Sequence, residues 1–186
     1  MVTNPDGAAA PPTSAEIARL LLDCGAVRFG DFTLASGARS DVYVDVKRAL
    51  TDPRRLERLA RALAAHAGTE ERLAGMELGA VPLVVALALA TGRPYAVLRK
   101  AAKEHGTRQP FEGELPANGR VLLVEDVTTT GGSTVRSVEI VRAAGARVDR
   151  ALVVVDREEG AADRLAAVGV RLEPLVRFSE IRAARP

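Results

Sequence analysis

The stretch that decides the fold runs from Val121 to Thr134 and reads VLLVEDVTTTGGST. Its first four residues are apolar, which is typical of a buried strand in a parallel sheet. Glu125 and Asp126 follow, and a loop of hydroxyl residues and glycines then leads into a helical pattern. Ligands of open α/β sheets bind beyond the carboxyl ends of the strands. The stretch therefore predicts a strand that presents two carboxylates to a ligand site.

The loop after these acids has the properties of an anion-binding site. It offers backbone N–H groups, hydroxyl donors and a helix N-terminus whose dipole favours negative charge. We therefore expect it to hold a phosphate. Because Glu125 and Asp126 would repel that phosphate, they must face hydroxyl groups or a cation, such as ribose hydroxyls or a metal. A ligand with a ribose beside a phosphate fits both parts, although an acidic strand end before a Gly-Gly turn also occurs without any ligand.

Composition restricts the classes of protein that the chain can belong to. Its 186 residues, 47% of them hydrophobic, suffice for one domain with a full core. Aromatic residues make up only 3%, so stacking surfaces for single-stranded nucleic acid are poorly supplied. The net charge of +2 suits phosphorylated ligands at least as well as a nucleic-acid surface. Cys24 is the single cysteine, which excludes an intrachain disulfide and indicates a reducing compartment.

The N-terminal residues give no sign of targeting. They lack the basic start and apolar segment of a signal peptide, and no apolar run approaches the ~20 residues of a membrane span. We therefore expect a cytoplasmic protein with no membrane partner. Residues 1–13 are rich in Pro, Ala and Gly and are expected to be a disordered tail. Residues 14–186 are expected to form a single domain.

Strand and helix patterns alternate along this domain. In residues 14–50 we expect a helix that begins with Ser14 as N-cap, then strands near Phe29–Leu34 and Val42–Val46, which together form a small αβ hood. Residues 51–186 form the core. The helices expected in the core are Asp52–His66, the apolar segment before Gly92, Ser133–Ala144 and Ala161–Val168. The expected strands are AGMEL after Leu73, Tyr95–Leu98, the run from Val121, ALVVVD ending at Asp156, and Val170–Val176. This alternation predicts an α/β fold with a central, mostly parallel sheet flanked by helices.

The loop after Leu98 reads RKAAKEHGTRQPFEGEL and is the second informative stretch. The chain has 23 arginines but only three lysines, Lys47, Lys100 and Lys103, and two of these fall in this loop beside His105. A chain so biased toward Arg that keeps Lys here indicates a need for a flexible point charge. Its glycines would let the loop move as a lid. The alternative is an ordinary solvated basic turn.

The stretch from Val121 resembles the PRPP-binding motif of the type I phosphoribosyltransferases, and the pattern RKxxKxHG narrows the resemblance to orotate phosphoribosyltransferase. The resemblance implies the type I fold and Mg-dependent transfer of the phosphoribosyl group from PRPP to orotate. The products would be orotidine 5′-phosphate and diphosphate, in pyrimidine (UMP) biosynthesis. It further implies Mg²⁺ bound mainly through PRPP, and a homodimer in which the lid loop 99–113 reaches the partner's site.

The resemblance also assigns roles to residues. Lys103, Glu125 and Asp126 would be catalytic, with Lys103 offsetting charge on the leaving group. Thr129 and Arg157 would bind orotate, although Arg157 could instead pair with Glu158 or Glu159. The lid residues would hold the diphosphate, the two acids the ribose hydroxyls, and the loop after them the 5′-phosphate. The implied PRPP contacts are Arg99, Lys100, Lys103, His105, Glu125, Asp126, Val127, Thr128, Thr129, Thr130, Gly131, Gly132 and Ser133.

The chain departs from the family pattern at two places. Many members place Lys after the FTL triplet where this chain has Ala35, so one PRPP contact is missing or supplied elsewhere. In MELGAVPL the chain has AVPL instead of GIPL, and Leu78 and Gly79 would offer only backbone groups beneath the diphosphate.

Two rival functions remain: transfer to another base, and a PRPP-sensing regulator that binds nucleic acid. The short N-terminal tail leaves no room for a helix-turn-helix domain, so we expect no nucleic-acid partner.

Overall fold

A six-stranded sheet forms the centre of the computed structural model, which describes residues 10–33, 37, 39–101 and 109–185. The strand order is β5-β4-β3-β6-β7-β8, and every neighbouring pair is parallel except β4 and β5. The strands are β3 (Arg72–Met76), β4 (Tyr95–Leu98), β5 (Phe111–Glu112), β6 (Val121–Thr128), β7 (Arg150–Asp156) and β8 (Arg171–Arg177). The expected central, mostly parallel sheet is confirmed.

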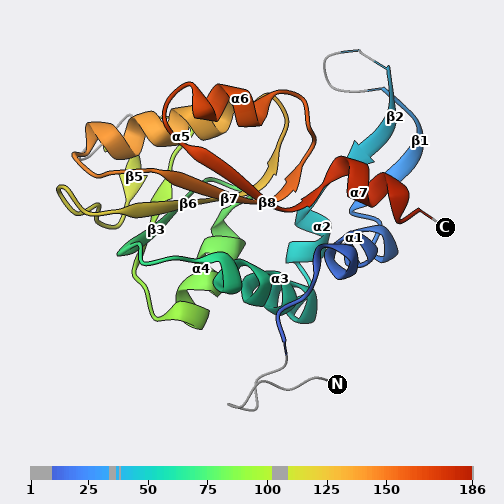
Figure 1. The fold of residues 1–186 in the computed structure, drawn as a ribbon, viewed down its shortest axis with the longest axis horizontal. Coiled ribbons are helices and arrows are strands. Elements are labelled where there is room, and N and C mark those ends of the chain that lie inside the picture. Colours follow the sequence, from blue (N-terminus) through green and yellow to red (C-terminus); the bar gives the residue numbers. More distant parts are fainter. Residues whose placement is uncertain (1–9, 34–36, 38, 102–108, 186) are drawn as a thin grey trace.

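Helices cover both faces of this sheet (Figure 1). The helices α3 (Pro53–His66) and α4 (Val81–Thr91) lie on one face, and α5 (Gly132–Ala143) and α6 (Ala161–Ala166) lie on the other. Because successive strand residues point to opposite faces, the apolar run of β6 fills both layers: Leu122 and Val124 pack in one cluster, Val121 and Leu123 in the other. No helix in the described part of the chain is long and apolar enough to cross a membrane.

A separate two-stranded antiparallel hairpin stands at one end of the molecule (Figure 1). It consists of β1 (Val27–Thr33) and β2 (Arg39–Val44), and the helices beside it are α1 (Ser14–Asp23), α2 (Lys47–Leu50) and α7 (Phe178–Ala183). The predicted N-cap of α1, Ser14, is wrong by one residue. Thr13 is the cap: its hydroxyl accepts from the Glu16 N–H at 3.3 Å, and its own N–H donates to the Glu16 carboxylate at 2.8 Å. This reciprocal capping box satisfies two free N–H groups at the start of the helix.

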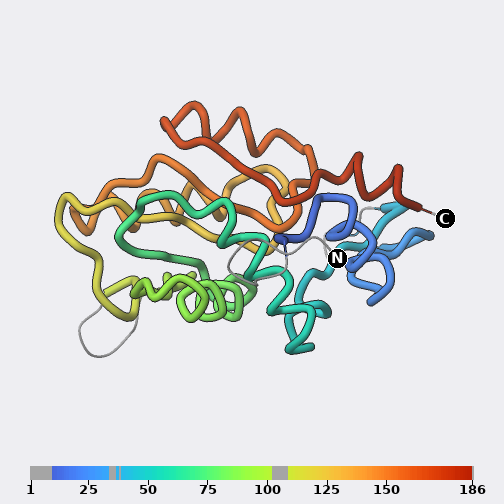
Figure 2. The backbone as a smooth tube through the Cα atoms, turned by 60° about the horizontal axis from the view of Figure 1, so that its bottom comes forward, coloured from blue at the N-terminus to red at the C-terminus, as the bar shows by residue number. Residues whose placement is uncertain are grey.

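The order of the strands creates a crevice at the carboxyl edge of the sheet. From β3 the chain passes through α4 to β4 on one side, whereas from β6 it passes through α5 to β7 on the other. The connections therefore leave β3 and β6 in opposite directions, which is the place where open α/β sheets bind ligands. Figure 2 shows these layers from a second angle, with the turns of α4 below the sheet and the C-terminal segments above it.

Candidate active site

A cavity of about 360 Å³ opens where β3 and β6 end side by side. Four segments that are far apart in the sequence line it: the start of α2, the end of β3 with the loop after it, the residues just after β4, and the end of β6 with the start of α5. Its lining residues are Lys47, Met76, Glu77, Leu78, Gly79, Lys100, Glu125, Asp126, Val127 and Ser133. The structure therefore brings the predicted carboxylates, one lid lysine and part of the predicted phosphate loop into one site.

The two carboxylates of β6 are buried in this cavity. Glu125 and Asp126 are each only 7% exposed. Burial, and then the negative charge of Asp126, raise the pKa of Glu125 to about 8. The Asp126 N–H also donates to the Glu125 carboxylate at 3.3 Å. Glu125 is therefore largely protonated at neutral pH in the ligand-free site, where it can donate a hydrogen bond as well as accept one.

The loop after β3 packs against this pair. The peptide bond between Glu77 and Leu78 is cis. A Cβ atom on Gly79 would lie 2.6 Å from the Asp126 Cγ, so only glycine leaves room for the Asp126 carboxylate here. The Glu77 carboxylate accepts from the Lys100 N–H at 3.0 Å, which ties this loop to the start of the lid.

The loop after the carboxylates leads into the 12-residue helix α5, as an anion site requires. Gly131 precedes the helix with a φ of 76°, and a Cβ atom there would lie 3.1 Å from the Ala161 Cα. Thr128 and Thr134 are buried, and among the described residues their hydroxyl oxygens have no hydrogen-bond partner. Ser133 lines the cavity beside the carboxylates. Ser133 thus brings a hydroxyl group, at the first turn of α5, to the cavity of the carboxylate pair.

The structure describes both ends of the lid loop. Lys100 lines the cavity, whereas the Arg99 guanidinium lies 3.2 Å from the Glu112 carboxylate. The Arg99 N–H donates to the Pro110 carbonyl at 2.8 Å, so the base of the loop is closed by backbone pairing. The two other predicted lid residues, Lys103 and His105, lie outside the described residues, as does Ala35.

The predicted orotate residues Thr129 and Arg157 do not line the 360 Å³ cavity. Arg157 follows β7, and its N–H donates to the Thr128 carbonyl at 3.0 Å, which places it beside the phosphate loop. Its guanidinium Nη2 lies 2.7 Å from the Glu159 carboxylate. This is one of the two ion pairs that the sequence left open as the alternative role of Arg157.

Lys47 is a cavity residue to which the sequence argument assigned no role. The signal was present: in a chain with only three lysines, Lys47 is the one that lies outside the lid. What the sequence lacked was its position in space. The first turn of α2 carries its side chain to the same cavity as Glu125 and Asp126.

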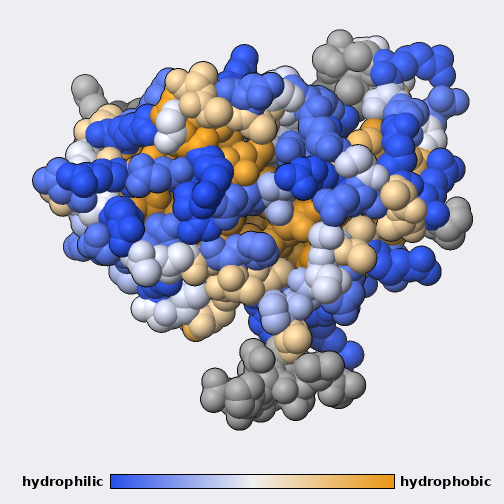
Figure 3. Space-filling model, in the orientation of Figure 1, coloured by the Kyte–Doolittle hydropathy of each residue, from blue (hydrophilic) through white to orange (hydrophobic). Residues whose placement is uncertain are grey.

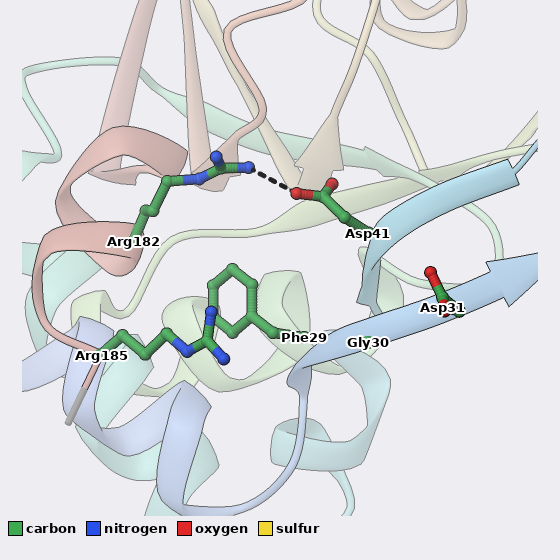
Figure 4. Close-up of a pocket in the computed structure, with 6 residues that line it drawn as sticks. All are labelled: Phe29, Gly30, Asp31, Asp41, Arg182 and Arg185. Carbon is green, nitrogen blue, oxygen red and sulfur yellow. Dashed lines mark hydrogen bonds and ion pairs between the residues drawn. The ribbon is translucent and has the colours of Figure 1, made fainter.

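A second pocket, of about 330 Å³, lies between the β1–β2 hairpin and α7 (Figure 4). The protein's own groups engage its two arginines: Arg182 pairs with Asp41 at 3.2 Å, and the Arg185 guanidinium lies 4.8 Å from the centre of the Phe29 ring. None of the predicted site residues lines this pocket. The cavity at the carboxyl edge of the sheet is therefore the candidate active site.

The fold is that of the phosphoribosyltransferases. The family model described as phosphoribosyl transferase domain matches residues 46–175. The orotate phosphoribosyltransferase of Methanoculleus marisnigri is 52% identical over 166 residues, which are 89% of this chain and 96% of that protein. The orotate phosphoribosyltransferase of Pyrococcus furiosus is 46% identical and covers 89% of this chain and 93% of its own length.

Solved structures of orotate phosphoribosyltransferases are similar to this chain as well. The crystal structure of orotate phosphoribosyltransferase from Aeropyrum pernix superposes with a TM-score of 0.80 at 39% identity, and covers 90% of this chain and 96% of that one. The Mycobacterium tuberculosis enzyme in complex with PRPP has a TM-score of 0.77 at 32% identity, with coverage of 92% and 99%. The chain belongs to the orotate phosphoribosyltransferase family.

Proposed function

We propose that the chain transfers the phosphoribosyl group of PRPP to orotate, giving orotidine 5′-phosphate and diphosphate for pyrimidine (UMP) biosynthesis. One observation carries the proposal: a buried carboxylate pair and a helix N-terminal hydroxyl loop meet at the switch point of a parallel sheet. PRPP has a ribose flanked by a phosphate and a diphosphate, so it matches this arrangement. The relatives named orotate phosphoribosyltransferase, and the M. tuberculosis relative solved with PRPP, support the same choice.

The ribose and its 5′-phosphate would occupy the end of β6. Glu125 and Asp126 would accept hydrogen bonds from the ribose hydroxyls, and the backbone and hydroxyl groups of residues 127–133 would hold the 5′-phosphate. In the reaction the bond from the anomeric carbon to the diphosphate breaks, a bond to a ring nitrogen of orotate forms, and the proton of that nitrogen is released to the diphosphate or to water. Positive charge develops on the ribose ring in the transition state, so the nearby Asp126 carboxylate stabilises it, and Glu125 adds to this effect in its ionised form.

The lid would neutralise the leaving group. Lys100 already lines the cavity, and its N–H is held by Glu77. In the proposal the partner's Lys103 and the partner's His105 join it when the partner's lid closes, and this Lys103 offsets the charge that develops on the departing diphosphate. Arg99 would have to leave Glu112 to take part. Closure of such a loop also excludes water from the reacting groups.

Mg²⁺ fits the groups that the cavity presents. The ion prefers oxygen ligands and is usually held by one or two carboxylates together with substrate phosphates. Glu77, Glu125 and Asp126 are the acidic residues that line the cavity, and Glu125 and Asp126 would be the ones beside the ribose. In the proposal most of the ligands are PRPP oxygens, and the ion offsets charge on the diphosphate.

Orotate would be recognised by its carboxylate. A guanidinium can bind a carboxylate through two parallel hydrogen bonds, and Arg157 is held beside the phosphate loop by its backbone contact with Thr128. Thr129 belongs to that loop and would complete the contact. The Glu159 carboxylate pairs with Nη2 of Arg157 in the ligand-free site, so it would compete with orotate for this guanidinium.

The surface of α4 supports a homodimer. The helix sequence VPLVVALALAT is apolar on all sides, a composition that normally indicates complete burial. Leu89 is nevertheless 83% exposed, and with Val85 and Tyr95 it lines an open groove. Figure 3 shows tan and orange atoms, which mark hydrophobic residues, at the lower edge of the molecule over α4. A second copy on this groove would lie beside β4, from which the lid loop 99–113 starts, so each lid could reach its partner's site.

Assays on the purified protein test the function directly. Incubation with PRPP, Mg²⁺ and orotate should release diphosphate and form orotidine 5′-phosphate, whereas omission of orotate should prevent both. Uracil, adenine and hypoxanthine serve as matched acceptors. Release with one of these but not with orotate would identify another base. No release with any base, together with salt-sensitive binding to nucleic acid, would favour the regulator.

We expect the reaction in the cytoplasm, carried out by residues 14–186 as one domain with residues 14–50 as its hood.

A further inference from the structure

Lys47 joins the candidate active site from a part of the chain that contains neither the PRPP motif nor the lid. It is the first residue of α2, and its neighbours Val46, Ala49 and Leu50 are buried in the core. The backbone that carries the lysine is therefore fixed by packing. Lys100 and Lys103, in contrast, belong to the loop that is expected to move.

The side chain of Lys47 is held at the cavity without being enclosed. Its ammonium lies 2.8 Å from the Asp45 carboxylate, and its side chain remains 57% exposed. The hydrogen bond to Asp45, with a smaller contribution from the charge of Asp126, raises the pKa of Lys47 above its ordinary value. An ammonium has three N–H donors, and the contact with Asp45 uses one of them. Lys47 thus presents a permanent positive charge with further donors to a ligand.

The charges of the cavity lining indicate that Lys47 offsets the negative charge of a bound anion. Among the described lining residues, Glu77 and Asp126 carry carboxylates, Glu125 carries a carboxyl group that is largely protonated at neutral pH, and Lys47 and Lys100 carry ammonium groups. PRPP is a polyanion, and most of its charge is on the diphosphate. With the lid open, Lys47 is the cation that the rigid body of the protein contributes to this lining.

The position of Lys47 in the cavity favours a contact with the diphosphate of PRPP over a contact with its 5′-phosphate or with orotate. In the proposed function the 5′-phosphate occupies the N-terminus of α5, and the predicted orotate residues Thr129 and Arg157 lie outside the cavity lining. Lys47 shares that lining with residues 76–79, the loop that is tied to the start of the lid. We propose that Lys47 binds the diphosphate of PRPP, is positioned by Asp45, and acts without the lid. This inference rests on the proposed function in taking PRPP as the ligand and in placing its 5′-phosphate and the orotate.

Calorimetric titration of the whole protein with PRPP and Mg²⁺, in the absence of orotate, tests this assignment. Lys47→Gln should raise the dissociation constant for PRPP about tenfold or more, because a charge-assisted contact is lost. Lys47→Arg, which keeps the charge, should recover part of the loss, and Asp45→Asn should cause a smaller one. Arg48→Gln is the matched control, since it removes one exposed positive charge from the next residue, outside the cavity lining.

Ribose 5-phosphate is the second probe, because it lacks the diphosphate. Its affinity should be the same for Lys47→Gln and the unaltered protein. An unchanged dissociation constant for PRPP, an equal loss with ribose 5-phosphate, or an equal loss in Arg48→Gln would each overturn the assignment. Because orotate is absent from these titrations, a protein that binds PRPP through Lys47 but transfers nothing to orotate would contradict the proposed acceptor and leave the inference standing.

Discussion

The Asp126 carboxylate lies directly against the backbone of Gly79, although the two residues belong to different segments of the cavity. The contact is so close that a Cβ atom on Gly79 would come within 2.6 Å of the Asp126 Cγ. It joins the loop after β3 to the end of β6 across the switch point of the sheet. The position of the carboxylate therefore depends on a glycine 47 residues earlier in the chain.

Replacement of Gly79 by alanine should displace the Asp126 carboxylate and weaken PRPP binding. We expect the KM for PRPP to rise at least about tenfold, because a misplaced carboxylate loses its hydrogen bonds to the ribose. Steady-state kinetics with PRPP as the varied substrate measure this effect, and circular dichroism verifies that the fold is retained. A well-folded Gly79→Ala variant with an unaltered KM for PRPP would show that the close packing is irrelevant to binding.

The buried Glu125 predicts how stability depends on pH. Its pKa is about 8 in the folded protein against an ordinary value of 4.5, so between these pH values the folded state binds a proton that the unfolded state has lost. The free energy of unfolding should therefore fall as pH rises through this window, by at most about 1.4 kcal/mol per unit. Urea denaturation of ligand-free protein at pH 6 and pH 8 measures the slope.

Glu125→Gln is the matched variant for this measurement, because glutamine has the same shape and does not titrate. The variant should lose this part of the pH dependence and gain stability relative to the unaltered protein at pH 8. An identical slope in both proteins would mean that Glu125 is already ionised in the folded state at pH 6.

Arg157 and Glu159 allow a test of acceptor recognition. Arg157→Ala should raise the KM for orotate more than about tenfold and leave the KM for PRPP nearly unchanged, since one charge-assisted carboxylate contact is lost. Glu159→Gln should lower the KM for orotate, because Nη2 of Arg157 no longer pairs with a carboxylate of the protein. If Glu159→Gln instead raises the KM for orotate, Glu159 orients Arg157 rather than competing with the substrate.

Leu89 provides a test of the dimer. Because its side chain is 83% exposed on the apolar face of α4, Leu89→Glu should leave the fold intact and convert a dimer to a monomer. Light scattering gives the mass, and the same protein is assayed for diphosphate release, which should fall with the loss of the partner's lid. A monomer that retains full activity would contradict a lid shared between subunits.

Mixing two inactive variants is a second test of whether each lid serves its own cavity or that of the partner. Lys103→Ala impairs the proposed lid, whereas Asp126→Asn impairs the cavity. If each lid serves the partner's cavity, mixed dimers contain one site in which both parts are unaltered, and activity should return on mixing. If each lid serves its own cavity, every mixed dimer lacks a complete site, and mixing should restore nothing.

Much of the fold could be predicted because its signals are local. The apolar run of β6, the spacing of Leu residues in α3 and the Gly92 that ends α4 each act on neighbouring residues. Three short elements were missed: α2 and β5, of four and two residues, are too short to show a period, and α7 follows β8 directly with no glycine or proline between them. Such segments are held by packing against distant parts of the chain.

For the site, the sequence by itself determined the chemical groups: a carboxylate pair, a hydroxyl and glycine loop before a helix, and a lysine-bearing loop. Their adjacency in VLLVEDVTTTGGST follows from the covalent chain, so reading the order of residues was enough. Only the tertiary structure decided that Gly79 packs on Asp126 and that Lys47 enters the cavity. These relationships join residues whose distance is set by the crossovers of the sheet and by core packing, which no local pattern encodes.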